Sequence, residues 1–284
     1  MGEQAARGRV VVLGSASQDL YVEMERHPTT GETVMSGDIV QRFGGKGGNQ
    51  AVAAARAGAR TLFVGRLGDD DPGHTYRDRL VRHGVNVSRL VMEPGVPTGT
   101  ALIMLNAQRD NMIVVAPGAN HHVDASQVEA LGDLGPDDVL LMPMELPRDV
   151  TVAGIRAAAD RGARVILNLA PYAPLPQDVL DKCFLVIVNE KENELMERDG
   201  LRAPSVLVTL GTAGSRWDDI TVPAQRVEVV DTTGAGDAYC GALAAALVSG
   251  VGLRDAMVAA TASSAATVQH LGAQPDPLGT VANR

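Results

Sequence analysis

The sequence predicts an α/β fold in which helices pack on a largely parallel sheet, with half-exposed antiparallel strands inserted early in the chain. From residue 138 onward, short apolar runs alternate with helical stretches, a pattern typical of βαβ units. Before that point, several segments alternate between apolar and polar residues, as strands with one solvated face do. Aromatic residues form only 3% of the chain, and the abundant Ala, Val, Leu and Gly favour close packing of helices on a sheet.

The first half of the chain predicts strands of two kinds. A short apolar run that ends at Gly14 predicts a buried strand at residues 9–14, and two half-apolar strands follow at 21–28 and 32–43. A helix is expected over 49–59, with Gly58 just past its last turn. The later elements are a strand at 60–68, an amphipathic helix over 73–84, and a hairpin formed by residues 99–107 and 111–118.

The second half contains four further apolar strands and Ala-rich helices. The strands are expected at residues 138–145, 163–171, 184–190 and 205–211. A helix over 149–162 separates the first two, and the segment between Asn189 and Val206 leaves room for one brief helix at most. Two more helices follow, one from about Asp237 and one within 253–273. No repeat or interdomain linker is visible, so we expect one domain over residues 1–284.

Charge and cysteine content restrict the partners and the compartment. The net charge of −9 argues against nucleic acid and acidic membranes as partners, so an anionic ligand must meet local positive potential. Cys183 and Cys240 are too few for a disulfide framework and lack the spacing of metal ligands, so we interpret both as core residues in a reducing compartment. No apolar segment has the length of a signal peptide or a membrane span, and we expect a cytoplasmic protein.

Two Gly-rich turns, each leading into a helix, carry the chemistry. In "VDTTGAGDAYCGALAAAL" (residues 230–247), the turn through Gly234, Ala235 and Gly236 leaves backbone N–H groups free at a helix start, which is an anion-binding arrangement. Asp237 stands at this junction and is suited either to cap the helix or to act as a base. A carboxylate beside an anion site is what phosphoryl transfer to an alcohol requires.

The other turn is "FGGKGGNQ", residues 43–50. Its four glycines permit positive φ and close approach of the backbone, and Lys46 adds a charge. It matches neither the P-loop nor the dinucleotide-binding pattern, and by itself it could be a flexible surface turn. Polar residues that follow the predicted strands belong to the same edge of a parallel sheet, where ligands bind. They are Glu145, Asn168, Asn189 and Glu190; Gly211 ends the strand expected at 205–211, and Asp231 follows a further short apolar run, "VEVV".

Taken together, "FGGKGGNQAVAAARAGA" and "VDTTGAGDAYCGAL" resemble the two signature regions of the PfkB-type carbohydrate kinases, and within them those of the ribokinases. The resemblance extends over nearly the whole chain through "PTTGETV", "GTALIML", "VAPGAN", "NEKENE", "VTLG" and "GAQP", in the order that the family shows. It implies a three-layer α/β/α sandwich of ribokinase type with a small β-sheet lid, supplied by residues near 15–45 and 96–116. Because the half-apolar lid strands need cover, which a partner lid provides in ribokinases, we expect a homodimer.

The resemblance also implies roles for individual residues. Asp237 would be the catalytic base, and the N–H groups that follow Gly234 (those of Ala235, Gly236 and Asp237) would form the anion hole. The sugar hydroxyls would be held by Ser17, Asp19, Gly45, Lys46, Asn49 and Glu145. ATP would be bordered by Asn189, Thr209, Gly211, Thr233 and Gly236, and Glu192 would position Mg²⁺. A monovalent cation, usually K⁺, would be held largely through backbone oxygens at Asp231, Thr233, Thr267, His270, Gly272 and Asp276.

The activity so implied is ATP-dependent phosphorylation of a primary hydroxyl of a pentose, D-ribose to D-ribose 5-phosphate. Three departures from the family pattern qualify it: Ser17 stands where ribokinases usually have Asn, the region after Glu192 is short, and the chain ends soon after "GAQPD". Ser17 leaves 2-deoxyribose, a ketohexose or a nucleoside open as the acceptor. The scarcity of aromatic residues near the lid argues against a nucleoside, and retention of Asp237 argues against a non-catalytic sugar-binding protein on the same fold.

Overall fold

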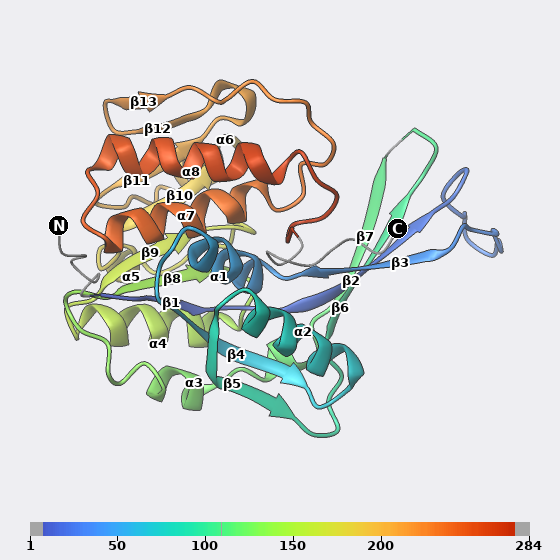
Figure 1. Cartoon of the computed structure of the whole chain (residues 1–284), viewed down its shortest axis with the longest axis horizontal. Helices are drawn as coiled ribbons and strands as arrows, with labels where there is room; N and C mark the ends of the chain where they lie inside the picture. Colours follow the sequence, from blue (N-terminus) through green and yellow to red (C-terminus); the bar gives the residue numbers. More distant parts are fainter. Residues whose placement is uncertain (1–7, 109, 276–284) are drawn as a thin grey trace.

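The computed structural model describes residues 8–108 and 110–275, which form a large layered body and a small projecting sheet (Figure 1). The large sheet has nine strands, in the order β13-β12-β11-β10-β9-β8-β1-β4-β5. Its parallel strands are β1 (Val10–Leu13), β4 (Thr61–Gly68), β5 (Asn86–Glu93), β8 (Val139–Pro143), β9 (Arg164–Asn168), β10 (Leu185–Asn189) and β11 (Val206–Thr209). The antiparallel strands β12 (Ser215–Trp217) and β13 (Ile220–Val222) complete one edge.

Helices cover both faces of this sheet, which confirms the predicted three-layer sandwich. One face carries α1 (Lys46–Arg56), α2 (Asp71–Arg82), α7 (Ala235–Val248) and α8 (Leu253–Thr267). The other carries α3 (Ala125–Glu129), α4 (Arg148–Ala159), α5 (Gln177–Leu180) and α6 (Glu190–Arg198). Short 3₁₀ turns lie at Gly118–His122 and Gly211–Ala213.

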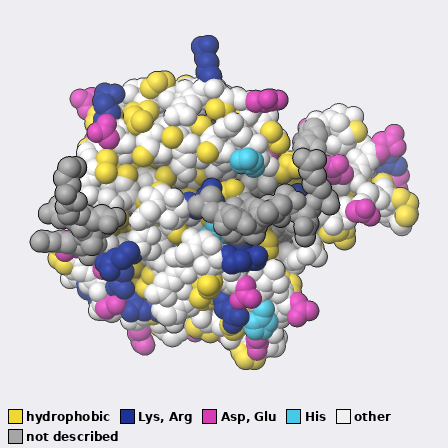
Figure 2. Space-filling view, in the orientation of Figure 1, with side chains coloured by type: hydrophobic (Ala, Val, Ile, Leu, Met, Phe, Trp, Pro, Cys, Tyr) yellow, Lys and Arg dark blue, Asp and Glu magenta, His cyan; other side chains and the backbone are white. Residues whose placement is uncertain are grey.

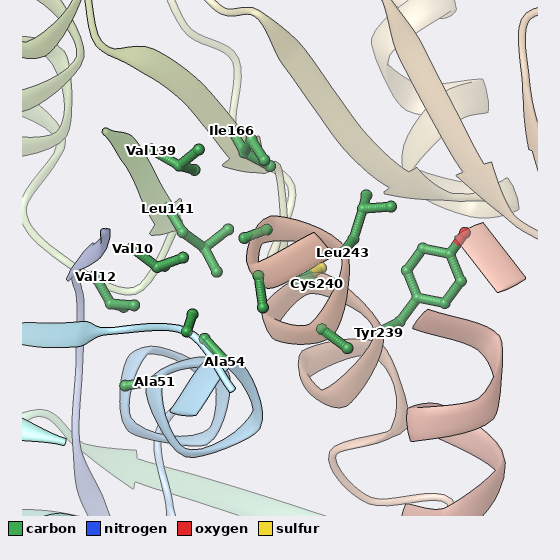
Figure 3. Packing of buried hydrophobic residues seen from close by; sticks show 14 of the residues in the cluster. Val10, Val12, Ala51, Ala54, Val139, Leu141, Ile166, Tyr239, Cys240 and Leu243 are labelled. Atoms are coloured by element: carbon green, nitrogen blue, oxygen red, sulfur yellow. The ribbon is translucent and has the colours of Figure 1, made fainter. Parts of the chain in front are cut away.

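Strand β1 lies inside the sheet and divides the core. Val10 and Val12 belong to one buried cluster, and Val11 and Leu13 belong to the other, because successive side chains of a strand point to opposite faces. Figure 3 shows Val10 and Val12 with Ala51 and other side chains of α1 and α7 on the first face. All four β1 residues are fully buried, as the uninterrupted apolar run predicts.

Helices α1 and α7 pack unusually close together. A Cβ atom on Gly241 would lie 2.4 Å from the carbonyl oxygen of Gln50 and 2.6 Å from Cβ of Ala53, so only glycine permits this contact. Asp237 lies one turn before Gly241 in α7, and Asn49 lies beside Gln50 in α1. The close packing therefore brings the starts of the two predicted helices, and with them the two Gly-rich turns, to one place.

The small sheet has the order β3-β2-β6-β7, with β2 (Ser17–Glu23), β3 (Ile39–Gly44), β6 (Gly99–Leu105) and β7 (Asn111–Ala116). These strands come from the two segments predicted for the lid. The expectation of antiparallel strands is confirmed for β2–β3 and for the hairpin β6–β7, but it is wrong for β2 and β6, which pair in parallel. Figure 2 shows this sheet projecting from the body with apolar and acidic side chains on its surface.

Candidate active site

A cavity of about 800 Å³ lies between the small sheet and the carboxyl edge of the large one. It is lined by every residue that the sequence predicts for sugar binding: Ser17, Asp19, Gly45, Lys46, Asn49, Glu145 and Asp237. Thr233 and Gly234 of the anion-binding turn line it as well. The fold thus brings residues from β2, from the starts of α1 and α7, and from the end of β8 to a single cavity.

Asp237 is 6% exposed and lies in the first turn of α7. Its Oδ2 accepts a hydrogen bond from Nδ2 of Asn49 at 3.0 Å, and its Oδ1 accepts one from Nε2 of Gln50 at 3.0 Å. The interpretation of Asp237 as the helix cap is wrong, because Gly234 occupies the N-cap position and no side chain caps the helix. The carboxylate is therefore directed into the cavity region by α1 and is not used to begin its own helix.

The turn before α7 has the geometry of an anion site. Gly234 has φ +75°, a left-handed conformation that favours glycine, and it turns the chain into the helix. Of the three predicted N–H groups, that of Ala235 already donates to the carbonyl of Thr232 at 3.2 Å. The N–H groups of Gly236 and Asp237 follow in the first turn, where a helix has no carbonyl of its own to offer them. The positive end of the helix dipole adds to their potential.

Lys46 is the first residue of α1, preceded by Gly45 with φ +79°. A cation at this position opposes the helix dipole and must be stabilised by other groups. Asp237, together with Glu145, provides this stabilisation and holds the pKa of Lys46 above its usual range despite partial burial. The ammonium group therefore stays charged beside the predicted base, and it supplies the local positive potential that the acidic chain otherwise lacks.

Asp19 and Glu145 are the two other carboxylates of the cavity. Asp19 is 9% exposed and accepts a hydrogen bond from the hydroxyl of Ser17 at 3.0 Å. Burial raises the pKa of Asp19 to about 6, and the charges of Glu145 and Asp237 act in the same direction. Glu145 accepts hydrogen bonds from the Ser15 hydroxyl and, at 2.8 Å, from the backbone N–H of Lys46. Glu145 therefore fixes the start of α1 through its hydrogen bond from the backbone, in addition to its charge interaction with the Lys46 side chain.

The residues predicted to contact the nucleotide do not line this cavity, apart from Thr233. Asn189 and Thr209 are register partners at the carboxyl ends of β10 and β11, and Gly211 follows in a 3₁₀ turn. Asn189 caps α6 and forms a capping box with Glu192. Burial raises the pKa of the Glu192 carboxyl, and the positive charge of Lys46 opposes this shift. The Glu192 side chain is therefore near enough to Lys46, which lines the cavity, for their charges to interact.

The segments predicted for the monovalent cation lie side by side. The N–H groups of Val230 and Asp231 both donate to the carbonyl of Val268, and the Asp231 carboxylate accepts from the N–H groups of Thr233 and Gly272. The hydroxyl of Thr267 is directed back into α8, and the side chain of His270 is exposed. Asp276 lies outside the described residues.

The sequence reasoning missed several residues of the site. Ser15, Tyr21 and Arg42 also line the cavity. The Tyr21 side chain, on the small sheet, lies near Thr233 of the turn before α7, and burial raises its pKa. No sequence motif identifies Tyr21 or Arg42, since alternate residues of any half-exposed strand would look alike. Gln50 lies inside the motif "FGGKGGNQ", but nothing in that motif identifies it as a contact of Asp237.

The described part of the chain shows no membrane or metal signature. None of its helices combines the length and apolarity needed to cross a bilayer. Residues 8–108 and 110–275 also contain no group of three or more His, Cys, Asp and Glu side chains placed to hold a metal ion.

Comparisons with known proteins place this chain in a family. Residues 7–279 match the pfkB family of carbohydrate kinases. The ribokinase of Bacillus subtilis is 35% identical over 277 residues, covering 93% of this chain and 94% of that protein. The ribokinase of Schizosaccharomyces pombe is 31% identical over 296 residues, covering 93% of each.

The solved structure of Arabidopsis thaliana ribokinase complexed with ribose and ATP resembles this one with a TM-score of 0.85. It is 31% identical, and the match covers 95% of this chain and 96% of that chain. The cavity between the two sheets, the anion-binding helix start and a family match over most of the chain lead to one conclusion: this protein is an ATP-dependent sugar kinase that belongs to the PfkB family of carbohydrate kinases.

Proposed function

We propose that this kinase transfers the γ-phosphoryl group of ATP to the primary hydroxyl of D-ribose and releases D-ribose 5-phosphate and ADP. The observation that carries the proposal is the position of Asp237: a buried carboxylate in the first turn of α7, in the same cavity as Asp19 and Asn49. The relatives named ribokinase and the structure that contains ribose and ATP support ribose as the acceptor.

The chemical step needs a base and stabilisation of charge. Asp237 accepts the proton of the primary hydroxyl while the sugar oxygen forms a bond to the γ-phosphorus and the bond from that phosphorus to the bridging oxygen of ADP breaks. The N–H groups of Gly236 and Asp237 and the helix dipole stabilise negative charge on the transferred group. Lys46, held in its charged form beside Asp237, contributes further positive potential.

Ribose would be held by the polar groups at the base of the small sheet. The Asp19 carboxylate and the Asn49 amide are suited to bind neighbouring hydroxyls, and the Ser17 hydroxyl already orients Asp19. Tyr21 of the small sheet and Thr233 of the turn before α7 line the same cavity, so we propose that this sheet is a lid that limits water during transfer.

Glu192 fits a role in positioning Mg²⁺ together with the phosphates. It offers one half-buried carboxylate, one oxygen of which accepts from the N–H of Asn189 at 2.8 Å. Mg²⁺ is commonly bound through one or two carboxylates plus substrate phosphates, and when bound it neutralises phosphate charge. K⁺ would be held by backbone oxygens of the segments 231–233 and 267–272, whose pairing through the Val268 carbonyl supports this proposal.

A homodimer through the lid and a cytoplasmic location complete the proposal. Strand β7 is exposed along its whole length, including Met112 (50%), Ile113 (53%), Val114 (59%) and Val115 (64%). Ile113 and Val115 line the cavity, whereas Met112 and Val114 point to the opposite face of the strand, and we propose that a second lid of the same kind covers part of this apolar surface. The free, buried thiols of Cys183 and Cys240 are consistent with a reducing compartment.

The substitution Asp237→Asn tests the base. It keeps the shape of the side chain and should preserve folding and ribose binding, measured by calorimetry. We expect the turnover number to fall by about 10²- to 10⁴-fold, as for loss of a general base. Normal turnover in this variant would exclude Asp237 as the base.

A panel of acceptors tests the substrate. D-ribose, 2-deoxyribose, fructose and adenosine should be compared by kcat/KM with ATP in excess, and D-ribose should have the highest value. If another acceptor exceeds ribose, the assignment of ribose is wrong, and Ser17→Asn, which restores the usual family residue, then shows whether this position sets the preference.

A further inference from the structure

Two consecutive residues of α1 hold both oxygens of the Asp237 carboxylate. Nδ2 of Asn49 donates to Oδ2 and Nε2 of Gln50 donates to Oδ1, each at 3.0 Å. Successive helix residues point about 100° apart around the helix axis, so the two amides reach the carboxylate from different directions. The plane of the carboxylate is therefore fixed by two separate donors.

Gln50 differs from Asn49 in its access to the cavity. Asn49 lines the cavity, whereas Gln50 is 0% exposed and does not line it. The contacts of the Gln50 amide are internal: besides Asp237, it donates to Oδ1 of Asn168 at 3.1 Å. Asn168 ends β9, so Gln50 links the predicted base to the edge of the large sheet. Gln50 can affect the reaction only through its neighbours.

The orientation of the Gln50 amide is set by its acceptors. Its NH₂ group has two N–H donors, and both are directed at side-chain oxygens, so a flipped amide would place Oε1 against those oxygens. In the observed orientation, Oε1 is buried and has no hydrogen-bond partner among the described residues. An unpaired buried acceptor costs free energy, and a methionine of similar size would avoid that cost. The value of glutamine here therefore lies in its two donors.

The Asn49 amide has a fixed orientation as well. Its Oδ1 accepts from Nε2 of Gln274 at 2.9 Å, and Oε1 of Gln274 accepts from Nε of Arg79 at 3.1 Å. Since a guanidinium group can only donate, Gln274 must present its oxygen to Arg79 and its NH₂ group to Asn49. The NH₂ group of Asn49 therefore faces Asp237, and its hydrogen bond to Oδ2 of that carboxylate does not depend on Gln50.

We propose that Gln50 is a positioning residue for phosphoryl transfer, which orients the Asp237 carboxylate toward the sugar hydroxyl. The inference rests on the proposed role of Asp237 as the base. Without Gln50, Asn49 still holds one oxygen, but the carboxylate can rotate about that contact. A misdirected base slows proton transfer, whereas the groups that bind sugar and ATP stay in place.

The test compares Gln50→Met with Gln127→Met. Gln127 is also buried, at 2% exposed, but it lies in α3, where it contacts Arg66 and Asp124 outside the cavity. For Gln50→Met we expect kcat to fall about 10- to 100-fold per folded enzyme, with KM for ribose and for ATP within about twofold of the wild-type values. Gln127→Met should keep the wild-type kcat. Asn168→Ala, which removes the second anchor of Gln50, should lower kcat in the same way but less.

The outcomes separate this inference from the proposed function. If Asp237→Asn is inactive while Gln50→Met turns over normally, the base stands and the positioning role is overturned. A rise in KM at unchanged kcat would overturn it too, since it would assign Gln50 to substrate binding. Normal turnover in Asp237→Asn would overturn the base and this inference together. If Gln50→Met does not fold, Asn168→Ala decides, and an unchanged kcat there contradicts the proposal.

Discussion

Replacing Asp19 by asparagine should stabilise the empty enzyme while removing a carboxylate that we propose binds ribose. Burial raises the pKa of Asp19 from 3.8 to about 6, so the folded protein prefers the neutral carboxyl. At 1.36 kcal/mol per pKa unit, this difference corresponds to about 3 kcal/mol. Asparagine resembles the neutral carboxyl in size and can keep the hydrogen bond from the Ser17 hydroxyl.

The sign of the pH dependence follows from linkage. The carboxyl of Asp19 has a higher pKa in the folded protein than in the unfolded chain. Its contribution to the stability of the folded protein is therefore fully present below the unfolded pKa, near 4, and is lost as the pH rises through about 6. Wild type and Asp19→Asn should therefore have similar free energies of unfolding near pH 4. At pH 8 the variant should be more stable by up to about 3 kcal/mol.

Urea unfolding of both proteins between pH 4 and pH 8, without sugar, measures this difference. Asp133→Asn is the control with the opposite sign, because Arg89 and Arg9 hold the pKa of Asp133 well below its usual range. That variant should be less stable than wild type by a nearly constant amount from about pH 5 to pH 8, because the stability that ionised Asp133 contributes is fully present above its unfolded pKa near 4. If the wild-type and Asp19→Asn curves stay parallel, burial of Asp19 does not carry the cost inferred here. The same variant should bind ribose far more weakly, measured by calorimetry at pH 8.

Three further changes test other parts of the site. Gly234→Ala should lower the free energy of unfolding by at least about 2 kcal/mol in urea, because φ is +75° and the new Cβ would lie 2.4 Å from Cβ of Ala273. Wild-type stability of this variant would show that the turn does not require glycine. Addition of K⁺ in place of a large organic cation should raise both turnover and Tm if the loop at Asp231 binds it, and unchanged values of both would remove that site. The double variant Val114→Lys, Val115→Lys should sediment as a monomer while wild type is a dimer; a dimer in both would place the interface elsewhere.

Most of the layered fold could be predicted because its signals are local. The apolar runs at β1, β8, β9 and β10 are strands of the large sheet, buried along nearly their whole length, and their length and composition distinguish them from helices. β5, β12 and β13 were missed. β5 is half-exposed without strict alternation, and β12 and β13 have three residues each, too few to show any period.

The parallel pairing of β2 with β6 could not be predicted for a different reason. The partners Ser17 and Gly99 are more than 80 residues apart in the sequence, and alternation within each strand is the same for either direction of pairing. The register is decided instead by the body of the protein, where the amide of Asn120 bonds both the N–H and the carbonyl of Ala16 just before β2. Such tertiary contacts leave no periodic mark on the sequence.

Site residues that lie in a sequence motif could be predicted. The contacts that orient them in the folded protein could not, because they involve segments far apart in the sequence. The turns that contain Lys46 and Asp237 were identified, and the structure brings both to the cavity. Of the two roles left open for Asp237, the cap is wrong, because a propensity for N-cap positions says nothing about the neighbouring helix that binds the side chain. The donor role of Gln50 required the close contact of α1 with Gly241, which no single motif reveals.

Three local conflicts lie in this cavity or directly behind it, and the two within it indicate what it is built to bind. Lys46 stands at a helix start where the dipole opposes a cation, Asp19 is buried with a raised pKa, and Oε1 of Gln50 is buried without a partner among the described residues. None of these helps the empty protein to fold. A phosphate group would meet Lys46 and the start of α7, and sugar hydroxyls would replace the water that Asp19 has lost. The two substrates of a sugar kinase would thus relieve the first two conflicts, while the third remains in the enzyme as the cost of a correctly oriented base.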